Sequence, residues 1–243
     1  MASPLEQFKL NQVLDFKIFN IDFHISNGTL TLFGITILII LFLTLLTRSL
    51  SIKPSKKQVV AEGFYNFIST MIAGNITYKQ KSKFIPFVFS LFIFILFSNL
   101  FGIIPYSFTI TSHISLTLAI ASVVFCLMVI LGIKRKGLKG YFAFFIPHGV
   151  PTFIAPLIFV IEFLTYLLRP FTLALRLTAN MIAGHTMLKV IAGFVVGMGA
   201  FGLVPVIFMS LLTGFEVFVA CLQAYIFTML TCIYINEALL KDH

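Results

Sequence analysis

The length of its uncharged apolar stretches limits this chain more than any other feature. Residues 84–133 contain no Asp, Glu, Lys or Arg, and residues 30–47 form a second uncharged run. A helix of about 20 apolar residues crosses a hydrocarbon core of about 30 Å. A water-soluble domain of 243 residues would need more charge than the 10% found here. The sequence therefore predicts an all-α membrane protein.

Interruptions in these stretches separate the spans. Residues 30–47 form the first, and Gly102, Pro105 and the polar residues 109–113 divide the longer run into a second and a third. Apolar helix resumes over about 151–198 and about 203–236. Here hydropathy leaves two alternatives open. A break at Pro170 gives six crossings, whereas one long tilted helix paired with a second long helix gives five.

The net charge of +9 comes mainly from two loops. Residues 48–83 carry seven basic side chains and one acid, Glu62, and residues 134–139 carry four more basic side chains. By the positive-inside rule both loops face the cytoplasm or its equivalent, which puts the N-terminus outside. This distribution indicates topology and argues against nucleic-acid binding. Three- and four-residue spacing of apolar residues in the first loop predicts an amphipathic helix along the membrane surface. Its apolar residues are Val60, Phe64, Phe67, Ile68, Met71 and Ile72.

The N-terminal 26 residues lack the basic start and short apolar core of a cleaved signal, so we expect the first span to be retained. Cys126, Cys221 and Cys232 show no metal-ligand spacing, and we expect them to be free, buried thiols. No metal and no cofactor are predicted.

Six ionisable residues occur where lipid-facing helix should carry none. They are Glu162, Arg169, Arg176, His185, Lys189 and Glu216. Burying one such charge costs about 3 kcal/mol or more on insertion scales. Ionisable residues inside a membrane therefore indicate an ion path, a proton relay or a counter-ion.

The spacing of these residues groups them on two helices. Glu162, Arg169 and Arg176 are seven residues apart and share one stripe, and Asn180 lies one turn beyond Arg176. Arg169, which precedes Pro170, is interpreted as a helix-packing or interfacial arginine. Lys189, nearer the other end, is expected to snorkel outward.

Matched depths predict contacts between the two helices of the five-crossing alternative. His185 lies about 13 Å outward of Arg176, and Glu216 lies about 10 Å outward of Gln223, at 1.5 Å per residue. Arg176 is thus expected to face Gln223, and His185 to face Glu216. An imidazole beside a carboxylate suits a proton relay because histidine titrates near neutral pH. A plainer interpretation of Asn180 and Gln223 is an amide bond between helices.

Three segments resemble the a subunit of F-type ATP synthase, the ATPase A chain family of the membrane Fo sector. The first is LRLTANMIAGH over residues 175–185, and the others are NLFGIIPYSFT over 99–109 and LQAYIFT over 222–228. Glu216 and His185 are exchanged relative to many bacterial members, as in mitochondrial and related alphaproteobacterial forms. The resemblance favours the five-crossing alternative, with a long tilted hairpin facing a ring of c subunits.

The resemblance implies a non-catalytic stator with two half-channels that carry protons to and from the ring carboxylates. Arg176 matches the essential arginine between the half-channels. The other implied proton-path residues are Asn180, His185, Glu216 and Gln223 on the outer side and Glu162 on the inner side. Asn99 is expected to pack between helices and is a further candidate for the outer path. Implied partners are the c ring, the b subunits of the peripheral stalk and membrane lipid.

The expected organisation is a single transmembrane domain over 1–243. It comprises an outer segment over 1–26, three spans with the basic amphipathic loop over 27–133, and the hairpin with the ion path over 140–239. We expect the bacterial inner membrane, with the mitochondrial inner membrane as the alternative. The rival classes are a secondary transporter, for which no inverted repeat is visible, and a haem-bearing subunit, which would need more histidines deep in the spans than His185. His113, His148 and His243 are interpreted as ordinary interfacial residues.

Overall fold

The computed structural model describes residues 12–18, 21–48, 54–77, 81–104, 110–143, 145–146, 151, 153–197 and 202–240. Five helical segments in these ranges are long and apolar enough to cross a membrane. They are Asn27–Thr47, Lys81–Ile103, Ile114–Leu138, Ala155–Val195 and Leu203–Leu239. The prediction of a helical membrane protein with five spans is confirmed. His148 and His243 lie outside the described residues.

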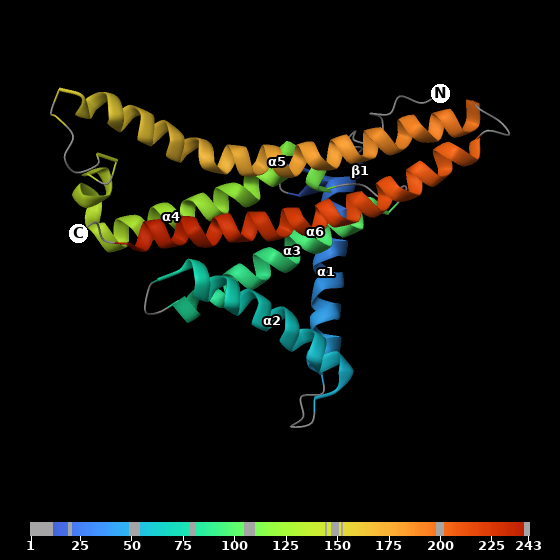
Figure 1. Cartoon of the computed structure of the whole chain (residues 1–243), viewed down its shortest axis with the longest axis horizontal. Coiled ribbons are helices and arrows are strands. Elements are labelled where there is room, and N and C mark those ends of the chain that lie inside the picture. The colour runs from blue at the N-terminus through green and yellow to red at the C-terminus, as the bar shows by residue number, and fades with distance from the viewer. Residues whose placement is uncertain are drawn as a thin grey trace.

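The last two spans form a long helical hairpin. Helix α5 (Ala155–Gly197) has 43 residues and continues through Pro170, and α6 (Leu203–Leu239) has 37. At 1.5 Å per residue they are about 65 Å and 55 Å long, whereas the hydrocarbon core is about 30 Å thick. Figure 1 shows the two helices side by side, lying across the direction of α1 (Asn27–Thr47). Because α5 does not break at Pro170, α5 and α6 count as one span each, which supports the five-crossing alternative. Helices of this length must tilt to stay within the core.

Helices α3 (Ile85–Ile103) and α4 (Ile114–Ala143) pack against this hairpin. Ala121 of α4, Ala174 of α5 and Ala224 of α6 are fully buried, so small residues allow the helix backbones to approach closely. The hydroxyls of Thr117 and Thr178 form a buried hydrogen bond of 2.8 Å between α4 and α5. Small residues and a polar bond between helices are typical of packing inside a membrane, where burial in lipid provides little driving force.

Helix α4 reverses direction near its end. Gly137 has φ 73°, a left-handed conformation that favours glycine, and it interrupts α4 within the second basic segment. The chain then folds back, and the ring of Tyr141 lies where a side chain at Gly132 would be, 2.7 Å from an ideal Cβ. Tyr141, Phe145 and Tyr166 contact one another edge to face, which closes this end of the α4–α5 packing.

The predicted amphipathic helix is present as α2 (Lys56–Asn75). Ile68, Met71 and Ile72 are buried against the body of the protein, whereas Val60 is exposed. Phe67 contacts Phe92 of α3 and Tyr225 of α6. The apolar side of α2 is therefore partly covered by the other helices, and its position along the membrane surface stays a prediction.

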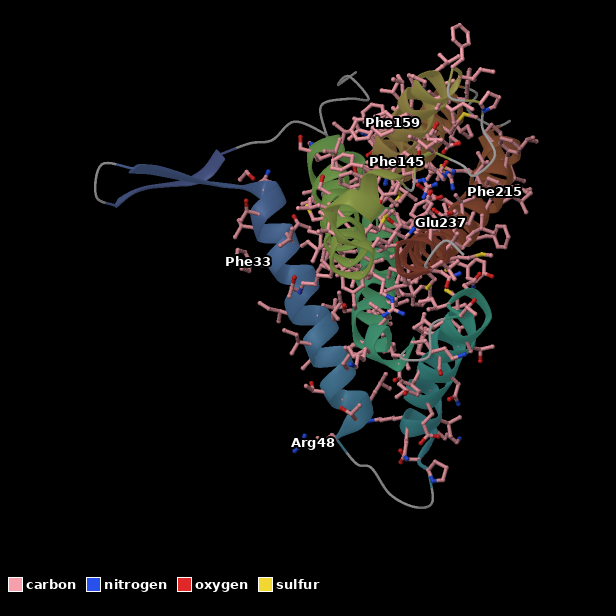
Figure 2. The ribbon with its side chains drawn as sticks, turned by 90° about the vertical axis from the view of Figure 1, so that its left-hand side faces the viewer. Phe33, Arg48, Phe145, Phe159, Phe215 and Glu237 are labelled. Atoms are coloured by element: carbon pink, nitrogen blue, oxygen red, sulfur yellow. The ribbon has the colours of Figure 1, made fainter. Side chains whose placement is uncertain are left out.

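A β-hairpin that the sequence did not predict precedes the first span. Strand β1 (Gln12–Ile18) pairs antiparallel with β2 (Ile21–Ser26). Ser26 ends β2 and also caps α1, because its hydroxyl accepts a hydrogen bond of 3.4 Å from the Thr29 backbone N–H. Figure 2 shows the hairpin projecting sideways from α1. The described protein is thus helical throughout its spans, with one short two-stranded sheet outside them.

Candidate functional site

Arg176 lies near the middle of α5 on its uncovered side. Its neighbours Leu173, Ala174 and Leu177 are buried, because they face the other helices, whereas Arg176 itself is exposed. Within the ranges that the structure describes, no side chain forms a hydrogen bond or an ion pair with its guanidinium. The α5–α6 hairpin therefore exposes a positive charge on its outer surface, near the middle of a helix that is expected to lie in the membrane.

One turn along α5, an amide pair joins the two helices of the hairpin. Asn180 Nδ2 donates a hydrogen bond of 3.1 Å to Gln223 Oε1 on α6. Gln223 is buried, and Asn180 is exposed beside Arg176. Matched depths had suggested Arg176 as the neighbour of Gln223, but the hydrogen bond of Gln223 comes from Asn180. The interpretation of Asn180 and Gln223 as an amide bond between helices is confirmed.

A histidine and a carboxylate meet farther along the hairpin. His185 Nε2 lies 3.9 Å from Glu216 Oε1, and both residues are at least nine-tenths buried. This distance is longer than a direct hydrogen bond and fits an ion pair or one bridging water. His185 also bonds to the backbone of Gly102 at the end of α3. The predicted contact between His185 and Glu216 is confirmed.

Gly184 permits the carboxylate to approach α5. An ideal Cβ at this position would lie 2.6 Å from Glu216 Oε1 and 3.0 Å from its carboxyl carbon, closer than real Cβ atoms come. Gly184, Asn180 and Glu216 line a cleft of about 310 Å³ between α5 and α6. The cleft therefore connects the amide pair to the buried acid. A helical glycine is a weak signal in a sequence, since its role depends on the residue opposite.

Helix α3 forms the back of this site. Asn99 is buried, and its Nδ2 donates a hydrogen bond of 3.3 Å to the backbone carbonyl of Ala220 on α6. The expectation that Asn99 packs between helices is therefore confirmed. Ala220 and Gly102 contribute to the site through their backbones, so residue types alone do not indicate them.

Several buried polar atoms of this region have no hydrogen-bond partner among the described residues. They include Asn99 Oδ1, Gln223 Nε2, Ser98 Oγ and both carboxylate oxygens of Glu216. Buried polar groups in proteins are nearly always hydrogen bonded to protein or water. The unused donors and acceptors, together with the cleft, are suited to a hydrated path beside the acid–base pair.

The remaining charges of the hairpin lie toward its other end. Arg169 forms an ion pair with Glu237 of α6, and its guanidinium lies over the rings of Tyr166 and Tyr234, 5.1 Å and 4.8 Å from their centroids. This confirms Arg169 as a helix-packing residue. Glu237 was not singled out from the sequence, because an acid near a chain end is ordinary. Glu162 lies seven residues before Arg169 on α5 and is exposed.

The structure corrects the expectation about the cysteines and does not test the one about Lys189. Cys126 and Cys221 are exposed on their helices and only Cys232 is buried, so the expectation of buried thiols was wrong for two of the three. Lys189 is half-buried and acts electrostatically on His185, and its outward snorkelling stays a prediction. Among the described residues no cluster of His, Cys, Asp or Glu has the composition of a metal site.

The hairpin thus carries an exposed cation, an amide pair and a buried acid–base pair in order along about 13 Å of α5. Such an arrangement can move protons along one side of the cation and oppose their passage across it. A family model described as ATP synthase A chain matches residues 29–236.

Proposed function

Because the chain belongs to the ATP synthase A chain family, it is a non-catalytic, multi-pass Fo subunit, and we propose that it conducts protons to and from a rotating ring of c subunits. In this proposal it is the stator, which stays fixed with the b subunits of the peripheral stalk while the ring turns. ATP chemistry belongs to other subunits. The membrane we propose is a bacterial inner membrane, with a mitochondrial inner membrane as the alternative.

The exposed position of Arg176 is the observation that carries this proposal. Facing lipid, the charge would cost about 3 kcal/mol or more, so it requires an anionic or hydrated neighbour. Arg169, two turns away, has Glu237 as its partner, whereas no described side chain pairs with Arg176. A carboxylate on another chain would supply the missing counter-charge. A ring whose carboxylates pass α5 in turn fits this requirement.

Arg176 would also be the barrier between the two half-channels. A guanidinium stays protonated at any relevant pH and repels H3O+, so protons cannot pass it through water alone. A ring carboxylate meeting Arg176 is favoured in its ionised form and releases its proton on the inner side. Beyond Arg176 the carboxylate is reprotonated. Protons therefore cross only when the ring moves.

The outer half-channel in this proposal runs past the acid–base pair. The cleft between α5 and α6 and the 3.9 Å separation of His185 and Glu216 support it. Asn180, Gln223 and Asn99 would hydrogen bond to water along this path. Glu162, exposed on the stripe of Arg176 about 21 Å along α5, is proposed for the inner path. Each proton that crosses 100 mV supplies about 2.3 kcal/mol to bias rotation.

Substitution of Arg176 tests the proposal in inverted membrane vesicles. Arg176→Ala is expected to abolish ATP-driven proton pumping, followed with a dye that reports internal acidification. Arg176→Lys should also fail, because an ammonium is a smaller, more strongly hydrated charge without the planar fork.

The matched control for this experiment is Arg169→Lys on the same helix, which keeps a cation beside Glu237 and should pump. Equal amounts of assembled complex must be verified for each variant. A normal pumping rate in Arg176→Ala would remove Arg176 from the mechanism and overturn the proposal.

A further inference from the structure

The register of the N-terminal hairpin separates its residues into two faces. Residues directly opposite in an antiparallel pair share a face, and successive residues along a strand alternate between faces. One face holds Leu14, Phe16, Ile18, Ile21, Phe23 and Ile25. The other face holds Asp15, Lys17, Asp22 and His24. The paired region is therefore apolar on one side and polar on the other.

The polar face is complementary within itself. Lys17 is the register partner of Asp22, and Asp15 is the register partner of His24. Opposite charges at facing positions stabilise a strand pair, and both signs together suit contact with water. The apolar face has no complement within the hairpin itself, and an isolated two-stranded hairpin is marginally stable in water. An apolar surface against this face would stabilise the strand pair.

The hairpin ends where the first span begins. Helix α1 has 21 residues and is about 31 Å long, which matches a hydrocarbon core of about 30 Å. Ser26 is both the last residue of β2 and the N-cap of α1, so no linker separates them. With α1 upright, the hairpin starts at the level of the membrane–water interface.

The strands run across the direction of α1 (Figure 2), so the whole hairpin stays near the membrane–water interface. Figure 2 shows the two strands extending sideways from the end of α1 and away from α3, α4, α5 and α6. Phe33, labelled in the same view, lies on the side of α1 below the hairpin. Phe33, Ile37 and Leu41 are among the most exposed apolar residues of α1. The hairpin therefore extends over the side of α1 that faces lipid.

We propose that β1 and β2 form an interfacial anchor that lies on the lipid surface. Its apolar face enters the boundary between headgroups and acyl chains, and its polar face remains in water, as with amphipathic helices at membranes. The continuity with the lipid-facing side of α1 favours lipid over a protein partner. The anchor would fix the depth and the rotation of α1 in the bilayer.

The absence of tryptophan from the sequence makes a single introduced tryptophan a unique probe. Phe16→Trp and Lys17→Trp place it on opposite faces of β1, in the full chain reconstituted in phosphatidylcholine vesicles with or without lipid brominated on its acyl chains. Tryptophan at position 16 should emit at shorter wavelength, and brominated lipid should quench it about threefold more strongly than at position 17. Iodide in the water should show the reverse order.

Phe23→Trp and Asp22→Trp repeat the comparison on β2, in case one substitution disturbs the strand pair. Equal quenching by iodide at both faces would mean that the hairpin stands in water. A short emission wavelength at positions 16 and 23 without quenching by brominated lipid would mean that a second copy of the chain covers the face. Either result overturns the proposal.

Discussion

At the scale of single residues, Gly184 shows how closely α5 and α6 approach at the acid–base pair. The carboxylate of Glu216 occupies the space that any larger side chain at position 184 would need. Because the Glu216 side chain is flexible, a methyl group added at position 184 would displace its carboxylate rather than separate the helices. The distance to His185 would change as a result.

We therefore expect Gly184→Ala to lower ATP-driven proton pumping while the subunit still assembles. A displacement of about 1 Å within a site that transfers protons can cost tenfold or more in rate, as a rough guide. Gly193→Ala is the matched control, since nothing lies within 4 Å of a Cβ there on the same helix. The pumping rates of the two variants are compared at equal amounts of complex. Equal rates would show that the position of Glu216 is unimportant.

Exchange of the acid and the base tests whether they act as a pair. His185→Glu places two acids together, and Glu216→His places two imidazoles together, so each single change should impair proton transport. The double variant restores one of each across the 3.9 Å contact and should recover more transport than either single variant. Passive proton flux through vesicles depleted of the soluble sector measures this. A double variant no better than the worse single variant would contradict direct pairing.

The residues of the site were predictable to the extent that helical spacing determines depth. His185 and Glu216 meet as their matched depths predicted. Depth does not define rotation about the helix axis, and the hydrogen bond that the structure gives Gln223 comes from Asn180 and not from Arg176. Gly184 escaped notice because its importance depends on a residue from another helix.

At the scale of elements, the α5–α6 hairpin is joined at both ends of its polar stripe. The acid–base pair lies toward one end, and the ion pair of Arg169 with Glu237 lies toward the other, flanked by Tyr166 and Tyr234. The Arg169 and Glu237 side chains are 21% and 34% exposed, so the pair is screened only in part. We infer that this contact holds the two helices in register below Arg176.

A double-mutant cycle on Arg169→Gln and Glu237→Gln should therefore be non-additive. Contacting charged residues typically show a coupling free energy of about 0.5–3 kcal/mol, and partial exposure favours the lower part of that range. Thermal unfolding of the purified subunit in detergent measures the three variants. Additive losses of stability would show that the two side chains do not interact in solution.

Hydropathy and periodicity located the helices but could not give their tilt. A run of apolar residues has the same composition whether it crosses the bilayer once at a slant or twice around Pro170, and the length of α5 decided between these. The spacing of apolar residues predicted α2 correctly. The hairpin over 12–26 was missed, although its residues alternate, because short alternating runs give a weak signal.

At the scale of the whole molecule, one short segment joins most of the spans. The 3-10 turn η3 (Ile110–Ser112) contacts α1, α3, α4 and α5, and His113 follows it just before the third span. Burial lowers the pKa of His113 below its ordinary value of 6.5. The neutral imidazole is thus favoured in the folded protein.

This shift predicts acid sensitivity of the fold. The unfolded chain binds a proton at His113 near pH 6.5, whereas the folded protein binds it only at lower pH. The free energy of unfolding should therefore decrease as the pH falls from 6.5 toward the folded pKa and level off below it. His113→Gln should flatten this part of the profile, measured by thermal unfolding in detergent across that range. An unchanged slope would assign the sensitivity to other groups.

The tilt of α5 also determines how many neighbours it can meet at once. A helix about 65 Å long that stays within a core about 30 Å thick extends about 58 Å along the plane of the membrane. Packed helices lie about 10 Å apart, so in the proposed complex α5 would border about five helices of the ring, whereas an upright helix would border one or two. Successive ring subunits would then contact different positions along α5 at the same time. If the proposed function holds, each proton-carrying site of the ring would move along α5 from one position to the next while staying in contact with the stator.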